Sequence, residues 1–249
     1  MRNAARLWLV VSLLTLALLA PGGRASAASD LLPDLAMSKL RHIGTTKTAD
    51  GRRLLRFSAI IVNVGEGPFE LRSRRANTRS RWSTRQVIFD DAGDSRSVAT
   101  PSVKLVYEGD GHDHWHVKDL EQYRLVPLRS ARPERIGQKV GFCFFDNYEY
   151  ELSLPDASLD PFYGRRGCGT RESVALRTGL SVGWGDIYHR RLPGQSIDIT
   201  DLPDGTYRLW ATADQADLFL ESNDGNNSTW ADLRIDARGA RVLRKAANP

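Results

Sequence analysis

The chain has 249 residues, of which 41% are hydrophobic and 26% are charged, with a formal net charge of +5. This length suits one all-β domain of roughly 200–250 residues and is enough for a real hydrophobic core. Three of the arginines lie within the first 27 residues, so the rest of the chain is nearly neutral and its charge gives no reason to expect a nucleic-acid partner.

Residues 1–27 have the pattern of a secretory signal peptide. Arg2 and Arg6 precede the apolar run 7–20, and the small residues Ala25-Ser26-Ala27 follow Pro21. The apolar run is shorter than the ~20 residues of a comfortable membrane span, although an uncleaved anchor is the alternative. We expect residues 28–249 to form one exported, extracellular domain with no membrane span once the signal is removed.

Short strands separated by turn residues are predicted along the rest of the chain. The expected strands lie within 31–43, 53–64, 68–72, 84–90, 102–107, 115–127, 138–145, 196–200 and 206–214, and on both sides of an Asp/Asn loop within 218–236. Residues 146–172, which contain prolines and glycines, are expected to be irregular. This spacing is typical of a β-sandwich, and no stretch has a helical period. We therefore predict an all-β fold, a β-sandwich with long irregular loops.

Two features bear on partners and on redox state. The arginines of 70–82 are interleaved with Ser, Asn and Thr in what reads as a loop, and we expect no nucleic acid to bind there. Contact with an anionic surface is the alternative. Cys143 and Cys168 are the only cysteines, and an even number in an exported chain favours a disulfide over two thiolate metal ligands.

Three of the five histidines alternate along one short stretch, at His112, His114 and His116. In an extended strand alternate side chains point to the same face, so the three imidazoles would point together. Neutral imidazoles suit copper, zinc, iron or nickel, and three of them leave coordination positions open, as catalytic metal sites do. A histidine-rich surface turn is the alternative, and the residues alone do not separate copper from zinc.

A second unusual stretch, residues 179–200, brings Asp186, Tyr188 and His189 close to Trp184 and several glycines. On its own this stretch is also typical of a glycine-rich turn with packed aromatic rings.

Four separated motifs, taken together and in this order, resemble the catalytic domain of the lysyl oxidases. They are HDHWH with the following KDLEQYRL (112–125), GQKVGFC (137–143), GLSVGWGDIY (179–188), and PDGTYRLWATAD with LFLESNDGNN (203–227). The resemblance covers roughly residues 33–235.

The resemblance implies a copper- and quinone-dependent amine oxidase. It assigns the copper to His112, His114 and His116, and a lysine tyrosylquinone cofactor, formed by the protein itself, to Lys139 and Tyr188. Primary amines, including the side chains of protein lysines, would be converted with molecular oxygen to aldehydes, ammonia and hydrogen peroxide. Asp186 would remove the proton from the carbon beside the amine.

The resemblance also implies a calcium site between an early Asp-Leu pair and the Asn-rich loop. Its residues would be Asp34, Leu35, Glu221, Asn223, Asn226 and Asn227, whose oxygen atoms suit calcium. The same loop is equally typical of a polar turn.

The sequence departs from the family at two places near the site, where Tyr123 and Gly185 occupy positions at which members have a histidine and a second tyrosine. Two other interpretations use the same histidines. One is a non-catalytic extracellular metal-binding or adhesive β-module, and the other is a zinc hydrolase with Asp186 as its base, which leaves Lys139 and Tyr188 without a role.

Overall fold

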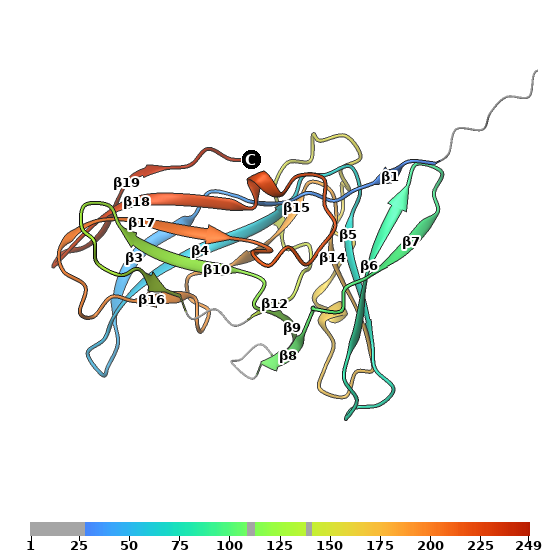
Figure 1. The fold of residues 1–249 in the computed structure, drawn as a ribbon, viewed down its shortest axis with the longest axis horizontal. Helices are drawn as coiled ribbons and strands as arrows, with labels where there is room; N and C mark the ends of the chain where they lie inside the picture. The colour runs from blue at the N-terminus through green and yellow to red at the C-terminus, as the bar shows by residue number, and fades with distance from the viewer. Residues whose placement is uncertain (1–27, 109–112, 138–140) are drawn as a thin grey trace, which may run out of the picture.

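The computed structural model describes residues 28–108, 113–137 and 141–249. The expected signal peptide, His112 and Lys139 lie outside the described residues. Antiparallel strands dominate the described part, together with two short 3₁₀ turns, η1 (Arg165–Cys168) and η2 (Asp224–Asn226). The predicted all-β fold is therefore confirmed (Figure 1).

Two sheets face each other across the main core. The first is centred on the long strand β4 (Arg53–Asn63) and also holds β2 (Leu35–Met37), β3 (Arg41–Lys47), β13 (Tyr148–Glu149), β15 (Trp184–Tyr188) and β16 (Ser196–Asp198). The second runs in the order β11 (Arg135–Ile136), β10 (Gln122–Pro127), β17 (Gly205–Thr212), β18 (Ser228–Asp236) and β19 (Gly239–Lys245).

Strand β4 explains why the two sheets pack. Because side chains alternate along a strand, Leu55, Phe57 and Ile61 all point to one face, where they are fully buried in the main core with Leu209 and Leu233 of the second sheet. On its opposite face β4 carries a smaller cluster with Ile60 and Val62. The strand is therefore covered on both sides, which suits its continuous run of branched side chains.

Two further sheets complete the described fold. One contains β1 (Asp30–Leu31), β5 (Phe69–Arg74), β6 (Ser83–Asp90), β7 (Ser95–Ala99) and β14 (Ala175–Leu180). The other is small, with the order β12 (Gly141–Phe142), β9 (His114–Lys118) and β8 (Leu105–Glu108), and in Figure 1 it lies between the large sheets.

A buried carboxylate ties β5 to β14. The Glu70 side chain is fully buried, and it accepts hydrogen bonds from Arg72 Nε at 2.5 Å, Arg177 Nε at 2.8 Å and the Tyr163 hydroxyl at 2.9 Å. Charge-assisted bonds from several donors offset the cost of burying one charge. This network fixes the irregular segment that carries Tyr163 to the edge of the sheet.

Several sequence-based expectations differ from the structure. Within the described residues, the strand expected over 138–145 is only β12, and β7 and β14 were not expected. The strand expected over 115–127 is two strands, because Asp119 adopts a left-handed backbone conformation with φ of 57° and the chain there turns into another sheet. Residues 218–222 do not form a strand. The N–H groups of Leu218 and Phe219 donate to the Asp214 carboxylate, and that of Leu220 donates to Gln86, instead of to a neighbouring strand. The strand expected over 68–72 extends as β5 to Arg74, so only the later part of the segment 70–82 lies in the expected loop.

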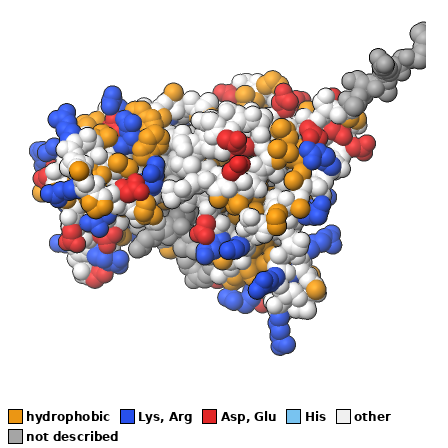
Figure 2. All heavy atoms as spheres, viewed as in Figure 1, with side chains coloured by type: hydrophobic (Ala, Val, Ile, Leu, Met, Phe, Trp, Pro, Cys, Tyr) orange, Lys and Arg blue, Asp and Glu red, His pale blue; other side chains and the backbone are white. Residues whose placement is uncertain are grey.

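On the face shown in Figure 2, basic and acidic side chains are interspersed at both ends of the molecule. Within the described ranges, no helix has the length and apolar character that crossing a membrane requires.

Candidate functional site

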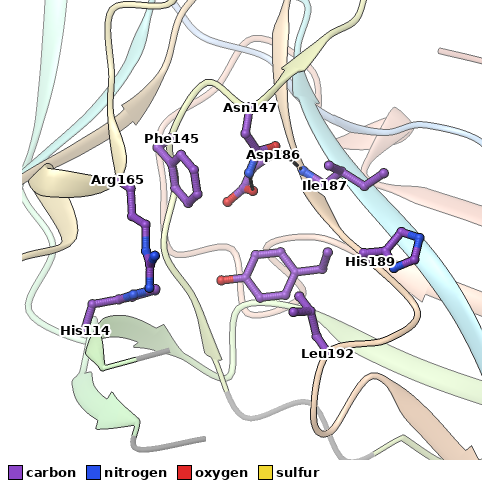
Figure 3. Close-up of a pocket in the computed structure, with 9 residues that line it drawn as sticks. His114, Phe145, Asn147, Arg165, Asp186, Ile187, His189 and Leu192 are labelled. Atoms are coloured by element: carbon purple, nitrogen blue, oxygen red, sulfur yellow. Dashed lines mark hydrogen bonds between the residues drawn. The ribbon is translucent and has the colours of Figure 1, made fainter. Parts of the chain in front are cut away.

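Strand β15 directs two of the predicted site residues into one cavity. Asp186 pairs with Ile61 and Tyr188 with Ala59 of β4, and their side chains share a face because they are two residues apart. Both are buried, with exposed fractions of 0% and 3%. The cavity has a volume of about 380 Å³ and is lined by His114, Phe145, Asn147, Arg165, Asp186, Ile187, Tyr188, His189 and Leu192 (Figure 3).

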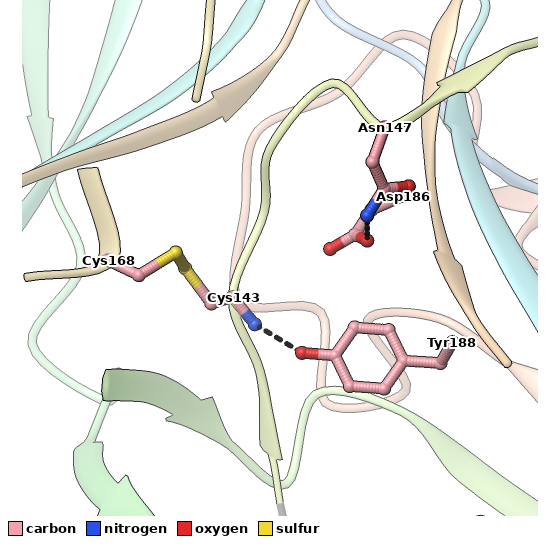
Figure 4. The surroundings of a disulfide bond; sticks show 5 residues. All are labelled: Cys143, Asn147, Cys168, Asp186 and Tyr188. Atoms are coloured by element: carbon pink, nitrogen blue, oxygen red, sulfur yellow. Dashed lines mark hydrogen bonds between the residues drawn. A yellow bond between two sulfur atoms is a disulfide. The ribbon is translucent and has the colours of Figure 1, made fainter. Parts of the chain in front are cut away.

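The Tyr188 ring is fixed against the segment that follows Lys139 in the sequence. It stacks on Phe142 with ring centroids 3.9 Å apart and an interplanar angle of 27°. Its hydroxyl accepts the backbone N–H of Cys143 at 3.0 Å (Figure 4). Although Lys139 lies outside the described residues, Gly141 begins β12 only two residues later. The two motifs assigned to the cofactor therefore meet in space.

Asn147 holds the carboxylate of Asp186. Its side-chain Nδ2 donates to Asp186 Oδ1 at 2.5 Å, and its Oδ1 accepts the backbone N–H of Ile187 at 2.8 Å. The backbone N–H of Asn147 in turn donates to the Gly185 carbonyl at 3.1 Å. These contacts fix the orientation of the buried carboxylate toward the cavity, as Figures 3 and 4 show.

The histidine strand lies beside this cavity. His114 and His116 on β9 are buried, with exposed fractions of 5% and 1%, and their ring centroids are 4.5 Å apart. The prediction that alternate histidines share one face is confirmed for this pair, whereas His112 lies outside the described residues. A Cβ at Gly141 would lie 2.7 Å from the His116 Cβ, so only a glycine lets β12 approach β9 this closely.

The predicted disulfide joins Cys143 to Cys168. Ligand atoms of His114 and of both cysteines lie within 4.8 Å of one another, but sulfur atoms bonded to each other are not thiolate ligands. Imidazoles are therefore the suitable donors for a metal here. The disulfide also attaches η1, and with it Arg165, to the wall of the cavity.

The buried hydrogen bonds of Tyr123, on β10, were not predicted from the sequence. The Tyr123 hydroxyl donates to Glu121 Oε2 at 2.5 Å and accepts from Gln195 Nε2 at 2.9 Å. Burial, followed by the neighbouring Glu121 carboxyl, raises the pKa of Tyr123 well above its usual value. The position where some family members have a histidine is thus a neutral, hydrogen-bonded phenol in this chain.

Asn147 was also missed, and no signal in the sequence points to it. It lies in a segment predicted to be irregular, 39 residues before Asp186. Only the pairing of β13 with β15 brings the two together.

The residues assigned to calcium converge at the first strands of the sheet. Glu221 accepts the Leu35 N–H and the Asn227 side-chain amide, both at 2.7 Å. Three buried oxygens of this cluster, Asp34 Oδ1, Asn226 Oδ1 and Asn227 Oδ1, accept no hydrogen bond from the described residues. Asn223 instead caps η2 by accepting the Gly225 N–H at 3.0 Å.

Burial disfavours the charged form of the carboxyl groups in this cluster. Burial raises the pKa of Glu221 to about 8, and it raises the pKa of Asp34 despite the nearby amides of Asn226 and Asn223. Oxygen atoms from two carboxylates and two amides, several of them buried without a donor, are the environment that a calcium ion would satisfy.

Comparison with known proteins gives the family. The model of the lysyl oxidase family matches residues 107–244. The chain is 34% identical over 130 residues to protein-lysine 6-oxidase of Gallus gallus, and 33% identical over 130 residues to that of Homo sapiens. Each of these alignments covers 52% of this chain and 28% of the relative. It is also 26% identical over 197 residues to lysyl oxidase homolog 2 of Gallus gallus, which covers 79% of this chain and 20% of the relative. The chain thus spans less than a third of the length of these relatives.

Proposed function

Since the chain belongs to the lysyl oxidase family, we propose that it is an amine oxidase that uses copper and a quinone made from its own Lys139 and Tyr188. It converts primary amines to aldehydes, with molecular oxygen as the second substrate and ammonia and hydrogen peroxide as further products. The name of the protein-lysine 6-oxidases makes the side chain of a protein lysine the first substrate to test. The observation that carries this proposal is that His114, Asp186 and Tyr188 line one cavity.

The described residues fit a copper ion. His114 and His116 are buried and lie on one face of β9, and with His112 they would supply three imidazoles. Imidazole suits copper, and three ligands leave a coordination position open. The disulfide keeps both cysteines out of the ligand set.

The surroundings of Tyr188 fit a quinone made from the chain. Its hydroxyl contacts the backbone four residues after Lys139, which places the two motifs against each other. When bound, the copper and the quinone would supply the redox chemistry, taking two electrons from the amine and passing them to oxygen.

The protein's own side chains would handle the proton and the water. Asp186 takes the proton from the carbon beside the substrate nitrogen, because it is the buried carboxylate of the cavity and shares a strand face with Tyr188. Asn147 orients this carboxylate, while the ring of Phe142 covers Tyr188. Phe142, Asp186 and Tyr188 are all buried, which limits the contact of this side of the cavity with water.

Mass spectrometry of copper-loaded protein tests the proposal. We expect a crosslinked peptide that contains Lys139 and Tyr188, and peroxide release on addition of a primary amine. Lys139→Arg and Tyr188→Phe should each abolish both signals. The matched controls Lys47→Arg, on an exposed part of β3, and Tyr207→Phe, in the second sheet, should retain them. Unmodified, separate peptides from fully copper-loaded protein would instead favour a non-catalytic metal-binding module.

We further propose that Asp34, Glu221, Asn226 and Asn227 bind one calcium ion, with the Asn223 turn closing the loop. Such an ion would join the start of the sheet at β2 to the loop before β18, since Leu35 and Glu221 are 186 positions apart in the chain. Its role would be structural.

We propose that the protein acts outside the cytoplasm. The disulfide suits an oxidising compartment, and residues 1–27 have the pattern of a signal peptide. Amino-terminal sequencing of exported protein should begin at Ala28.

A further inference from the structure

A second cavity of about 620 Å³ adjoins the candidate active site. Its basic side chains are His42, Arg56, His189, Arg190 and Arg191, which we call the basic pocket. His189 lines this cavity and the first one as well. The two spaces therefore meet at the end of β15, directly after Tyr188.

The positive charge of the basic pocket is not neutralised by the protein. Arg56, Arg190 and Arg191 form no ion pair with any residue in the described ranges. Burial, and then the nearby charges of His42, Arg191 and Arg190, lower the pKa of His189. The arginines thus disfavour further positive charge in the pocket, and an anion placed among them would relieve their mutual repulsion.

Hydrogen bonds hold the His42 ring, the Arg56 guanidinium and the backbone of Arg190 in position. Ser58, fully buried on β4, accepts the N–H of Arg190 at 2.9 Å and is hydrogen-bonded to His42 Nδ1 at 3.0 Å. Arg56 Nη1 donates to the carbonyls of Arg190 and Leu192 at 3.1 and 3.2 Å. The guanidinium of Arg190 lies over Gly44, where a Cβ would be 3.3 Å from its Nη1. The part of the pocket formed by His42, Arg56 and Arg190 is thus organised before any ligand arrives, which lowers the cost of binding.

The approach to the active site is therefore unfavourable for a substrate that carries only positive charge. Among the described residues that line the two cavities, Asp186 is the only carboxylate, whereas Arg165 adds a further cation to the first cavity. In Figure 3, Asp186 points to one side of β15 and His189 points to the other. His189, which lines both cavities, joins this cationic side to the cavity that holds Tyr188.

We propose that the basic pocket binds a carboxylate of the substrate, so that the enzyme selects primary amines that carry an anionic group near the reacting nitrogen. This inference rests on the proposed amine oxidase function and names its substrate class. The same chemistry is offered by an acidic residue beside a peptidyl lysine and by the α-carboxylate of free lysine. Arginine recognises carboxylates through paired N–H donors, which makes Arg190 and Arg191 the specificity-determining residues.

Matched substrates test the proposal. One pair is a blocked peptide with lysine between two glutamates and the same peptide with two glutamines. The second pair is free lysine and lysine amide. Peroxide release would be measured for each with the copper-loaded, full-length protein. For at least one pair, we expect kcat/KM of the anionic member to be about tenfold higher than that of its neutral partner. This is the size of effect that a charge-assisted hydrogen bond produces. The pair that responds identifies the source of the carboxylate.

Variants test whether the preference for anionic substrates comes from the basic pocket. Arg190→Gln combined with Arg191→Gln should remove the preference by raising KM for the anionic substrate, while kcat changes little, because the contact is the same before and during the reaction. Arg85→Gln, an exposed arginine on β6 that lines neither cavity, is the charge-matched control and should keep the preference. Raising the salt concentration should weaken the preference only in proteins with an intact pocket.

The two hypotheses fail in different ways. Absence of peroxide with every amine, and absence of the crosslink, would contradict the proposed function. Equal turnover within each substrate pair, or a preference that remains in the double variant, would overturn the proposed role of the basic pocket. Neither result would contradict the amine oxidase function.

Discussion

Removal of calcium gives the most direct physical test of the site at Glu221. We expect a chelator to lower the melting temperature, since it leaves Asp34 Oδ1, Asn226 Oδ1 and Asn227 Oδ1 buried without a partner in the described part of the protein. Calcium sites of extracellular modules have Kd values of about 10⁻⁴–10⁻³ M. At about 10 mM calcium, binding would then stabilise the fold by roughly 1.4–2.7 kcal/mol. For a chain of this size that corresponds to a rise in Tm of about 3–10 °C.

The calcium effect should increase with pH. In calcium-free protein, burial raises the folded-state pKa of Glu221 from 4.5 to about 8, so the folded state holds this proton more tightly than the unfolded state does. The resulting stability is fully present below pH 4.5 and is lost as pH rises toward 8, by up to about 1.4 kcal/mol per pH unit. The raised pKa values of Asp34 and Asp214 act in the same direction. Calcium binds the ionised carboxylate, so it restores the stability that is lost at the higher pH.

The measurement is Tm at pH 5 and pH 8, with chelator, calcium or magnesium. Glu221→Gln keeps the acceptor for the Leu35 N–H but removes the charge, so it should abolish most of the calcium response. Glu134→Gln, at an exposed surface carboxylate, should leave the response unchanged. A wild-type Tm that calcium does not change at pH 8, or an equal response in Glu221→Gln, would refute this site.

Three further predictions concern the cavity and its support. Asp186→Asn should lower kcat by about 10²–10⁴-fold while the crosslinked peptide still forms, and a loss below about tenfold in stopped-flow or peroxide assays would remove Asp186 as the base. Glu70→Gln should lower the free energy of unfolding by about 1–3 kcal/mol in urea titrations, because it weakens three charge-assisted or buried hydrogen bonds, and an unchanged midpoint would show that the network adds nothing. The double variant Cys143→Ala/Cys168→Ala opens a loop of 25 residues and should lose about 3–4 kcal/mol, whereas a loss under 1 kcal/mol would mean that the segment is held by its other contacts.

The strands that were predicted well are those with a strong local pattern. Residues 53–63 and 83–90 carry runs of branched and aromatic side chains, and both are strands with nearly the predicted bounds. Residues 218–222 have a similar apolar pattern but form no strand, because the Asp214 carboxylate and the Gln86 side chain take the backbone N–H groups. A local pattern cannot reveal a partner that lies 134 residues away.

The same division holds for the candidate site. Alternation along 112–116 was enough to predict that His114 and His116 share a face, because that property belongs to a single strand. The contacts of Asn147 with Asp186, and of Phe142 with Tyr188, depend on how separate strands pair. The four motifs, in their order, indicated which segments form the site. The residues that support it, Asn147 and Phe142, could be identified only from the fold.

The disulfide has a consequence for the order in which this protein matures. In the disulfide-bonded protein the sulfur atoms of Cys143 and Cys168 lie within 4.8 Å of a ligand atom of His114. On reduction, the two thiols and His114 would therefore offer a soft ligand set that favours zinc or cuprous copper. Closing the S–S bond removes this competing chelator, and it also fixes the backbone N–H that positions the Tyr188 hydroxyl. Thiol oxidation would therefore precede productive metal loading, and protein retained in a reducing compartment would stay inactive. Metal analysis of protein purified under reducing and oxidising conditions should show zinc in the first and copper in the second.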